Sequence, residues 1–278
     1  MTNTHTTATS SPARSTPATS MPAVYLPHGG GPAFFMDGGM GDMFRPMGVF
    51  LGAFHTLLPA RPTAILVITA HWEATVPTTT GGQNPALIYD YYGFPKETYE
   101  ITYPAPGSPA LAQDAANLLR QAGIDAVVDA QYGWDHGVFI PLKLMFPGAD
   151  IPVVAMSLKV GLDPAEHVAI GAALRPLRNQ GVLIMGSGMS YHNLRQMGNG
   201  AAAAQFDHWL DTALSGDSAH RRDRLAQWAE APAGRLSHPR EEHLLPLMVA
   251  SGAGSDVPGR KLWSGLVGPT AVSAWAFS

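Results

Sequence analysis

The chain contains no cysteine among its 278 residues. Disulfides, thiolate metal ligands and cysteine nucleophiles are therefore excluded, and a metal site would have to use nitrogen and oxygen ligands. Because a protein without disulfides suits a reducing compartment, we expect a cytoplasmic location.

Long apolar runs and basic clusters are also lacking. No stretch approaches the ~18 consecutive apolar residues of a membrane span, so no membrane partner is expected. The net charge is −4, and the most basic stretch, residues 220–224, is interrupted by Asp223. This charge pattern argues against a nucleic-acid partner. The expected partners are small molecules, and a homo-oligomer is left open.

After Met1, residues 2–20 lack large apolar side chains and consist almost entirely of Thr, Ser, Ala and Pro. Such a segment cannot bury enough surface to become ordered, so residues 1–20 are predicted to form a disordered tail. The tail has no apolar segment typical of a secretory signal. Residues 21–278 show no linker or long repeat, and they are expected to form one domain.

Strand-like and helix-like segments alternate along this domain, which predicts an α/β fold with a mostly parallel central sheet flanked by helices. The expected strands are residues 24–26, 64–70, 125–129, 152–158, 182–185 and 271–277. The expected helices are residues 109–121, 138–145, 163–178, 202–214, 221–229 and 239–250. Residues 85–109, rich in Tyr, Pro and Gly, are expected to form a hairpin and a loop that lines a site.

Three histidines follow predicted strands. His28 comes directly after residues 24–26, in the motif PHGGG, and His71 comes directly after residues 64–70. His192 follows the strand at 182–185 by a few residues. In open α/β sheets the ligand crevice lies beyond the carboxyl ends of the strands, so these three side chains are expected to converge.

Two further histidines lie in segments able to face that crevice. His136 is in the motif WDHG, which predicts a tight turn beside an aromatic side chain. Ser237 and Pro239 predict a helix start that places Glu242 or His243 on its first turns. The histidines at 5, 55, 167, 208 and 220 lie in the tail or in helical stretches and are assigned no role.

Alternative chemistries remain open at this stage. PHGGG also resembles the oxyanion loop of esterases, which requires a nucleophile elbow G-x-S-x-G between a strand and a helix. The nearest candidate, residues 216–220, has His220 in place of the last glycine and follows a helical stretch. A zinc hydrolase, or a non-catalytic metal-binding protein with the same ligands, is the other alternative.

Six ordered blocks of the sequence are similar to those of a known enzyme family. They are PHGGG, TAHWE, YDYYGFP with YPAPGSP, WDHGVFIPLKLMFP, GSGMSYHNL and HPREEHLLPL. Together they resemble the class III extradiol ring-cleaving dioxygenases, specifically the DOPA 4,5-dioxygenase branch. The resemblance extends from about residue 21 to the C-terminus, so it identifies residues 21–278 as the catalytic domain.

The resemblance implies a mononuclear non-haem Fe(II) enzyme that opens a small aromatic diol with O2. By motif, His28, His71 and His243 are implied as metal ligands. His192 is implied as an acid/base group that also touches the metal in some states, and His136 as a proton donor to the substrate. Zn(II) is expected to be able to occupy the same site, because affinity rises toward the end of the divalent series.

Two points in the site are left open by the sequence. The wider superfamily uses two histidines and one glutamate, so Glu242 is the alternative to His243 as third ligand. Four aromatic side chains are candidate walls for the substrate: Tyr91, Tyr92, Phe94 and Trp134. The expected substrate is a substituted single-ring catechol, and a DOPA-like amino acid, a caffeate-like acid and a smaller phenol all remain candidates.

Overall fold

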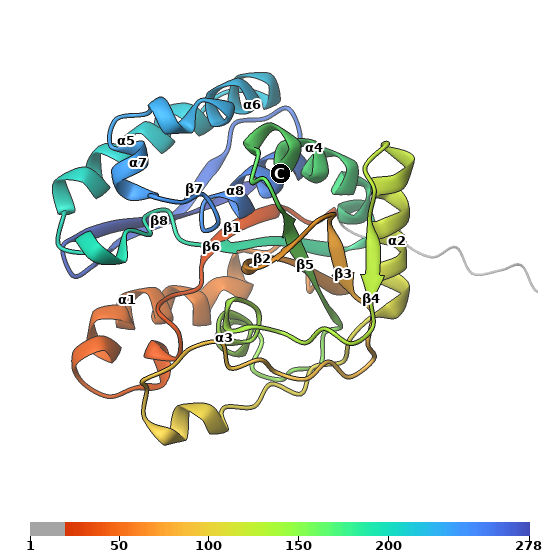
Figure 1. Ribbon diagram of the computed structural model, residues 1–278, viewed down its shortest axis with the longest axis horizontal. Helices are drawn as coiled ribbons and strands as arrows, with labels where there is room; N and C mark the ends of the chain where they lie inside the picture. Colours follow the sequence, from red (N-terminus) through yellow and green to blue (C-terminus); the bar gives the residue numbers. More distant parts are fainter. Residues whose placement is uncertain (1–19) are drawn as a thin grey trace, which may run out of the picture.

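The computed structural model describes residues 20–278, and the predicted tail at residues 1–19 lies outside the described residues. A sheet of eight strands in the order β4-β3-β5-β2-β6-β1-β8-β7 runs through the molecule (Figure 1). Its strands are β1 Ala23–Pro27, β2 Ala64–Ala74, β3 Thr78–Thr80, β4 Val127–Asp129, β5 Val153–Lys159, β6 Val182–Gly188, β7 Arg260–Val267 and β8 Thr270–Phe277. The helices are α1 Gly39–Ala53, α2 Pro109–Gln121, α3 His136–Met145, α4 Pro164–Leu174, α5 Gly200–Leu214, α6 Ser218–Ala226, α7 Gly234–Ser237 and α8 Leu245–Ala253.

The centre of the sheet is parallel. Strands β5, β2, β6 and β1 are neighbours and pair in parallel, and β4 is parallel to β3. Antiparallel pairs join β3 to β5, β8 to β1 and β7 to β8. The predicted α/β class with a mostly parallel sheet is confirmed, and the carboxyl ends of β1, β2 and β6 lie side by side.

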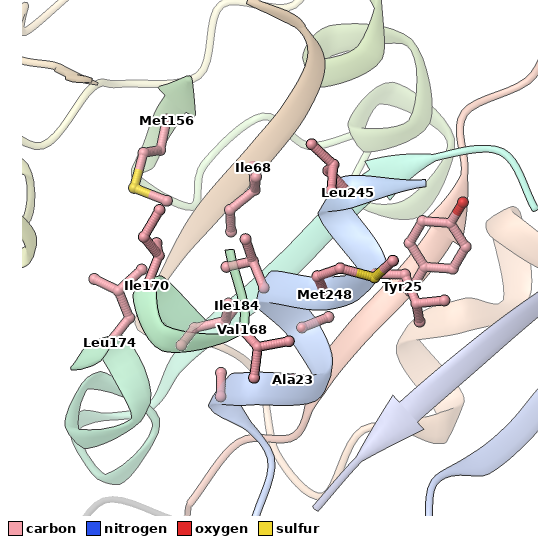
Figure 2. Packing of buried hydrophobic residues seen from close by; sticks show 14 of the residues in the cluster. Ala23, Tyr25, Ile68, Met156, Val168, Ile170, Leu174, Ile184, Leu245 and Met248 are labelled. Carbon is pink, nitrogen blue, oxygen red and sulfur yellow. The ribbon is translucent and has the colours of Figure 1, made fainter. Parts of the chain in front are cut away.

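Alternate residues of the central strands enter two separate cores, one on each face of the sheet. Ala23 and Tyr25 belong to the first core, whereas Val24 and Leu26 belong to the second. In the first core, residues of β1, β2 and β6 pack against helices α4 and α8 (Figure 2). Helices α1 and α3 cover the opposite face (Figure 1). Burial on both faces explains why these strands are nearly continuous apolar runs.

Helix α2 has the bounds that its sequence predicts. The Ser108 hydroxyl accepts a hydrogen bond from the Leu111 N–H at 3.3 Å, and Pro109 occupies the first turn. The helix expected at residues 163–178 is shorter, because α4 ends at Leu174 and the chain continues as a 3₁₀ turn over Arg175–Gln180. Within residues 20–278, no helix combines the length and apolar character needed to cross a bilayer.

Two predicted elements differ from the structure. The helix expected at 239–250 begins only at Leu245, because residues 239–244 form turns and the helix-starting proline is Pro246. Residues 85–109 form no hairpin; they contain a 3₁₀ turn, Lys96–Glu100, and isolated bridges to other segments. Side-chain hydrogen bonds hold this segment in place of a strand ladder, since the hydroxyls of Tyr89 and Tyr91 donate to the backbone carbonyls of Ile101 and Thr98.

Candidate metal centre

Three histidines from distant parts of the chain meet at the carboxyl edge of the sheet. His28 directly follows β1, His71 lies in β2 and His243 lies in the turn before α8. Their candidate ligand atoms all lie within 4.8 Å of one another. The Nε2 atoms of His28 and His71 are 3.1 Å apart, and the ring centroids of His71 and His243 are 4.9 Å apart. The spacing suits one shared metal ion.

The position of His71 differs slightly from the prediction. Strand β2 continues through His71 to Ala74 instead of ending before it. Its pairing with β6 ends at Thr69, and its pairing with β5 changes register between Ile68 and Glu73. His71 therefore occupies an irregular part of the strand, beyond the last pair with the central neighbour.

The position of His243 is fixed by hydrogen bonds that its backbone carbonyl accepts. Its carbonyl oxygen accepts hydrogen bonds from the Tyr25 hydroxyl at 2.8 Å and from the Met189 N–H at 3.1 Å. Gly188, the last residue of β6, leaves the space for this approach, because a Cβ there would lie 2.1 Å from the His243 oxygen. The end of β6 therefore positions the third histidine.

Hydrogen bonds to Nδ1 orient the imidazoles of His28 and His243. The Ser187 hydroxyl donates to the Gly137 carbonyl, so its oxygen accepts from His28 Nδ1 at 3.0 Å. His243 Nδ1 lies 3.0 Å from Glu242 Oε1 and donates to that carboxylate. With the proton on Nδ1, Nε2 carries the free lone pair that a metal requires.

The donor set fits a metal ion. His71 Nδ1 lies 3.4 Å from Asp90 Oδ2, so its Nε2 is also free to bind. His243 Nε2 is buried and has no hydrogen-bond partner among the described residues. A buried polar atom without a partner is unfavourable, and a metal at the meeting point of the three Nε2 atoms would satisfy it.

The three imidazoles are neutral at physiological pH. Burial, followed by the nearby histidines, holds the pKa of His28 well below its usual value. Burial also lowers the pKa of His71 to about 3, with a further contribution from His136. For His243, burial again lowers the pKa, although its hydrogen bond to Glu242 opposes the shift. Neutral imidazole is the form that coordinates a metal.

His136 lies beside this group and is held by Asp90. It is the first residue of α3, two residues before the predicted start of that helix, and so is not in a free turn. Its Nδ1 and its backbone N–H both donate to Asp90 Oδ1, at 2.8 and 2.9 Å. Burial alone would raise the pKa of Asp90, but the bonds from His136 lower it, so the carboxylate is ionised. Sequence reasoning missed Asp90, although it lies within the block YDYYGFP.

His192 stacks on His243. Their ring centroids are 3.3 Å apart at an interplanar angle of 16°. Glu242 lies behind both rings, with Oε1 at 3.4 Å from His192 Nδ1, and it groups with these two histidines, not with His28 and His71. Burial opposes ionisation of Glu242, but its hydrogen bonds from His192 and His243 outweigh burial and lower its pKa far below the usual value.

All five histidines line one cavity of about 350 Å³. Its walls are apolar and include Met40, Phe44, Tyr91, Phe94, Met189, Leu194 and Met197. Of the four aromatic residues expected to form walls, Tyr91 and Phe94 do so, whereas Tyr92 is 91% exposed and Trp134 is fully buried elsewhere.

The structure disfavours a nucleophile elbow. Ser218 begins α6 directly after α5, not after a strand, and its hydroxyl donates to Asp256 at the surface. The histidines at 55, 167, 208 and 220 lie outside the cavity, and His5 lies outside the described residues.

An α/β sheet that presents three neutral imidazoles and two further histidines in a small apolar cavity defines a metal-dependent enzyme. The family of that enzyme follows from comparison with known proteins. Residues 22–275 match the family described as the catalytic LigB subunit of aromatic ring-opening dioxygenase. The chain belongs to this family and is an extradiol ring-opening dioxygenase.

Individual relatives agree with this assignment. The chain is 45% identical to dioxygenase tasH of Hapsidospora irregularis over 69% of the chain and 64% of that protein. It is 40% identical to 4,5-DOPA dioxygenase extradiol of Portulaca grandiflora, over 82% of the chain and 84% of the relative. The crystal structure of uncharacterized protein JW3007 from Escherichia coli K12 superposes with a TM-score of 0.74 at 30% identity, covering 93% of this chain and 100% of that one.

Proposed function

We propose that this protein is a non-haem Fe(II) dioxygenase that opens a substituted single-ring catechol with O2. The observation that carries the proposal is the convergence of His28, His71 and His243 in a cavity of about 350 Å³. Three ligands on one side of a metal leave positions for the two catechol oxygens and for O2. The cavity volume and its aromatic walls suit one substituted ring, and relatives named for DOPA support that substrate class.

Iron held by the three imidazoles would supply Lewis acidity toward the diol and bring the diol and O2 together. In the net reaction, the ring carbon–carbon bond beside the diol breaks. One oxygen atom of O2 enters a new carboxylate and the other enters a new aldehyde, so no external reductant is required. During this reaction the protein must also accept a proton from the diol and return one as the ring opens.

We assign the acid/base role to His192. Its Nδ1 faces Glu242, which leaves the other ring nitrogen for a substrate hydroxyl in the cavity. Its stacking on His243 places it next to the ligand group. We assign His136 as a second proton donor, because Asp90 holds its Nδ1 and its ring lies 4.0 Å from that of His71. Contact of His192 with the metal itself remains a prediction.

The test is reconstitution of metal-free protein with Fe(II) under anaerobic conditions, followed by catechols and O2. We expect oxygen uptake and a yellow semialdehyde with Fe(II) and neither with Zn(II). No uptake with any catechol, despite a filled iron site, would refute the proposed reaction and favour hydrolysis or metal binding alone.

A histidine variant separates catalysis from metal binding. His192→Ala is expected to lower the rate by about 10² to 10⁴ while the iron content stays the same, because a general acid/base contributes that much. The exposed His208→Ala in α5 is the matched control. Full activity of His192→Ala would remove the assigned role.

A further inference from the structure

A second hollow adjoins the histidine cavity. It has a volume of about 570 Å³ and is formed by residues 192–196 and by Pro239, Arg240 and Glu242. His192 and Leu194 line both spaces, so the two meet at the proposed acid/base residue. A ring seated in the inner cavity therefore has an outer space next to it that is able to receive a substituent.

The two spaces differ in charge. Among the residues that the structure describes, no Lys, Arg, Asp or Glu lines the inner cavity, and its polar side chains are histidines and two tyrosines. Both tyrosine hydroxyls are already used, because Tyr91 donates to the Thr98 carbonyl at 2.6 Å and Tyr191 to the Gln196 carbonyl at 2.8 Å. An ionised acidic substituent placed there would lose its hydration without meeting a lysine or arginine among these lining residues.

The outer hollow contains two arginines, and one of them is already paired. Arg240 donates to both carboxylate oxygens of Glu73, at 2.6 and 2.7 Å, and lies 3.4 Å from Glu242. Across residues 20–278, by contrast, the exposed guanidinium of Arg195 takes part in no ion pair, and only its backbone N–H forms a hydrogen bond, to Asn193. Arg195 is therefore the cation of this hollow that is free to bind an anion.

We propose that Arg195 binds a carboxylate on the side chain of the substrate, an inference that rests on the function proposed above. The catechol ring occupies the histidine cavity, and a short acidic tail passes His192 and Leu194 to reach the guanidinium. Planar guanidinium and carboxylate groups form paired hydrogen bonds, which make Arg195 a specificity-determining residue. The preferred substrates are thus catechols with an anionic tail.

Two catechols that differ only in the carboxylate test this inference: 3-(3,4-dihydroxyphenyl)propionate and 4-ethylcatechol. With the iron-loaded enzyme, we expect the KM of the acid to be roughly two- to fivefold lower, since the pair is exposed and its effect modest. Arg195→Gln should raise the KM of the acid until the ratio of the two KM values approaches one. Arg222→Gln, the same change on α6, is the control.

A binding measurement gives a readout independent of turnover. Calorimetric titration compares 3-(4-hydroxyphenyl)propionate with 4-ethylphenol, which both lack the second hydroxyl. The acid should bind more tightly, and Arg195→Gln should remove the difference. If both catechols are cleaved with equal KM values, or if Arg195→Gln leaves the ratio as it was, the inference is refuted and the proposed function stands. If neither catechol is cleaved, the proposed function fails, and the phenols still decide whether Arg195 binds the anion.

Discussion

At the scale of single residues, each proposed ligand histidine has a polar partner at Nδ1. Ser187 accepts a hydrogen bond from His28 and Glu242 accepts one from His243, whereas Asp90 Oδ2 lies 3.4 Å from His71 Nδ1. Such partners fix the tautomer and the ring orientation of a metal ligand. Two of them are shared with the proposed catalytic histidines, since Asp90 also holds His136 and Glu242 also contacts His192.

Replacing Glu242 by glutamine should weaken metal binding. The uncharged amide accepts less strongly from His243 Nδ1 and His192 Nδ1, so we expect metal affinity to fall roughly 10- to 100-fold. Competition with a chelator measures this affinity. The neighbouring Glu241→Gln, whose carboxylate pairs with Arg235, should bind metal as the wild type does. Equal affinities for the two variants would contradict the role of Glu242.

Asp135 should make stability depend on pH. Burial, with the nearby Asp90 charge, raises the pKa of Asp135 to about 6 from its usual 3.8. The folded state therefore holds this proton more tightly, and the stability it contributes is present below about pH 4 and is lost as pH rises through 6. Relative to Asp135→Asn, the wild type should lose on the order of 2 kcal/mol between pH 4 and 7.

Urea unfolding of both proteins at several pH values measures this difference, and effects common to both cancel. The exposed Asp37→Asn is the control and should follow the wild type. Parallel pH curves for the wild type and Asp135→Asn would show that the Asp135 carboxyl does not retain its proton in the folded protein.

At the scale of elements, the contact between the end of β6 and the turn before α8 leaves no room for a side chain at Gly188. Gly188→Ala places a methyl group 2.1 Å from the His243 oxygen, so the turn must move. We expect a loss of about 1–3 kcal/mol of stability, as for overpacked cores, together with weaker metal binding. Gly198→Ala is the control, because a Cβ there has no atom within 4 Å. Normal metal binding by Gly188→Ala would mean that the turn adjusts without moving the imidazole.

Sequence patterns predict the elements that are buried on both faces or clearly capped. Strand β2 was expected from its apolar run, and α2 from Ser108 and Pro109. The sequence patterns do not predict α1, β3, β7 or the four-residue helix α7. Helix α1 has glycines and an internal proline, β3 has three residues, and β7 is a largely exposed edge strand. Local sequence gives weak signals for such elements, which depend on tertiary packing.

Most of the candidate site was predictable because the strands that carry it are buried apolar runs. Histidines directly after buried strands are visible in the sequence, and β1 and β6 bring His28 and the His192 segment to one edge. The groups that orient the imidazoles were not predictable, because Asp90 and Ser187 approach from segments far away in the chain. Arg195 also gave no signal, since its significance comes from the hollow around it.

At the scale of the whole molecule, the metal should link distant parts of the fold. It would join His28, His71 and His243, which lie directly after β1, in β2 and in the turn before α8. At a free metal concentration of 100 times Kd, binding adds about 2.7 kcal/mol of stability. For a chain of this size, that corresponds to a rise in Tm of roughly 5–10 °C.

Thermal unfolding after chelation, and again after Fe(II) or Zn(II) is added back without oxygen, measures this rise. His243→Ala should abolish most of it, whereas His208→Ala should retain it. Identical Tm values for the metal-free and metal-loaded wild type would show that the metal does not bridge these elements.

The pairing of β8 with β1 has a consequence for the synthesis of the chain. β1 is made first, yet one of its two neighbours is the final strand, with Tyr25 opposite Trp275. His28 therefore emerges from the ribosome long before His243, and one edge of β1 stays unpaired until β8 has been made. A metal that needs both histidines can bind only after the segment that carries His243 has been synthesised, and the open edge of β1 is exposed to aggregation until β8 pairs with it.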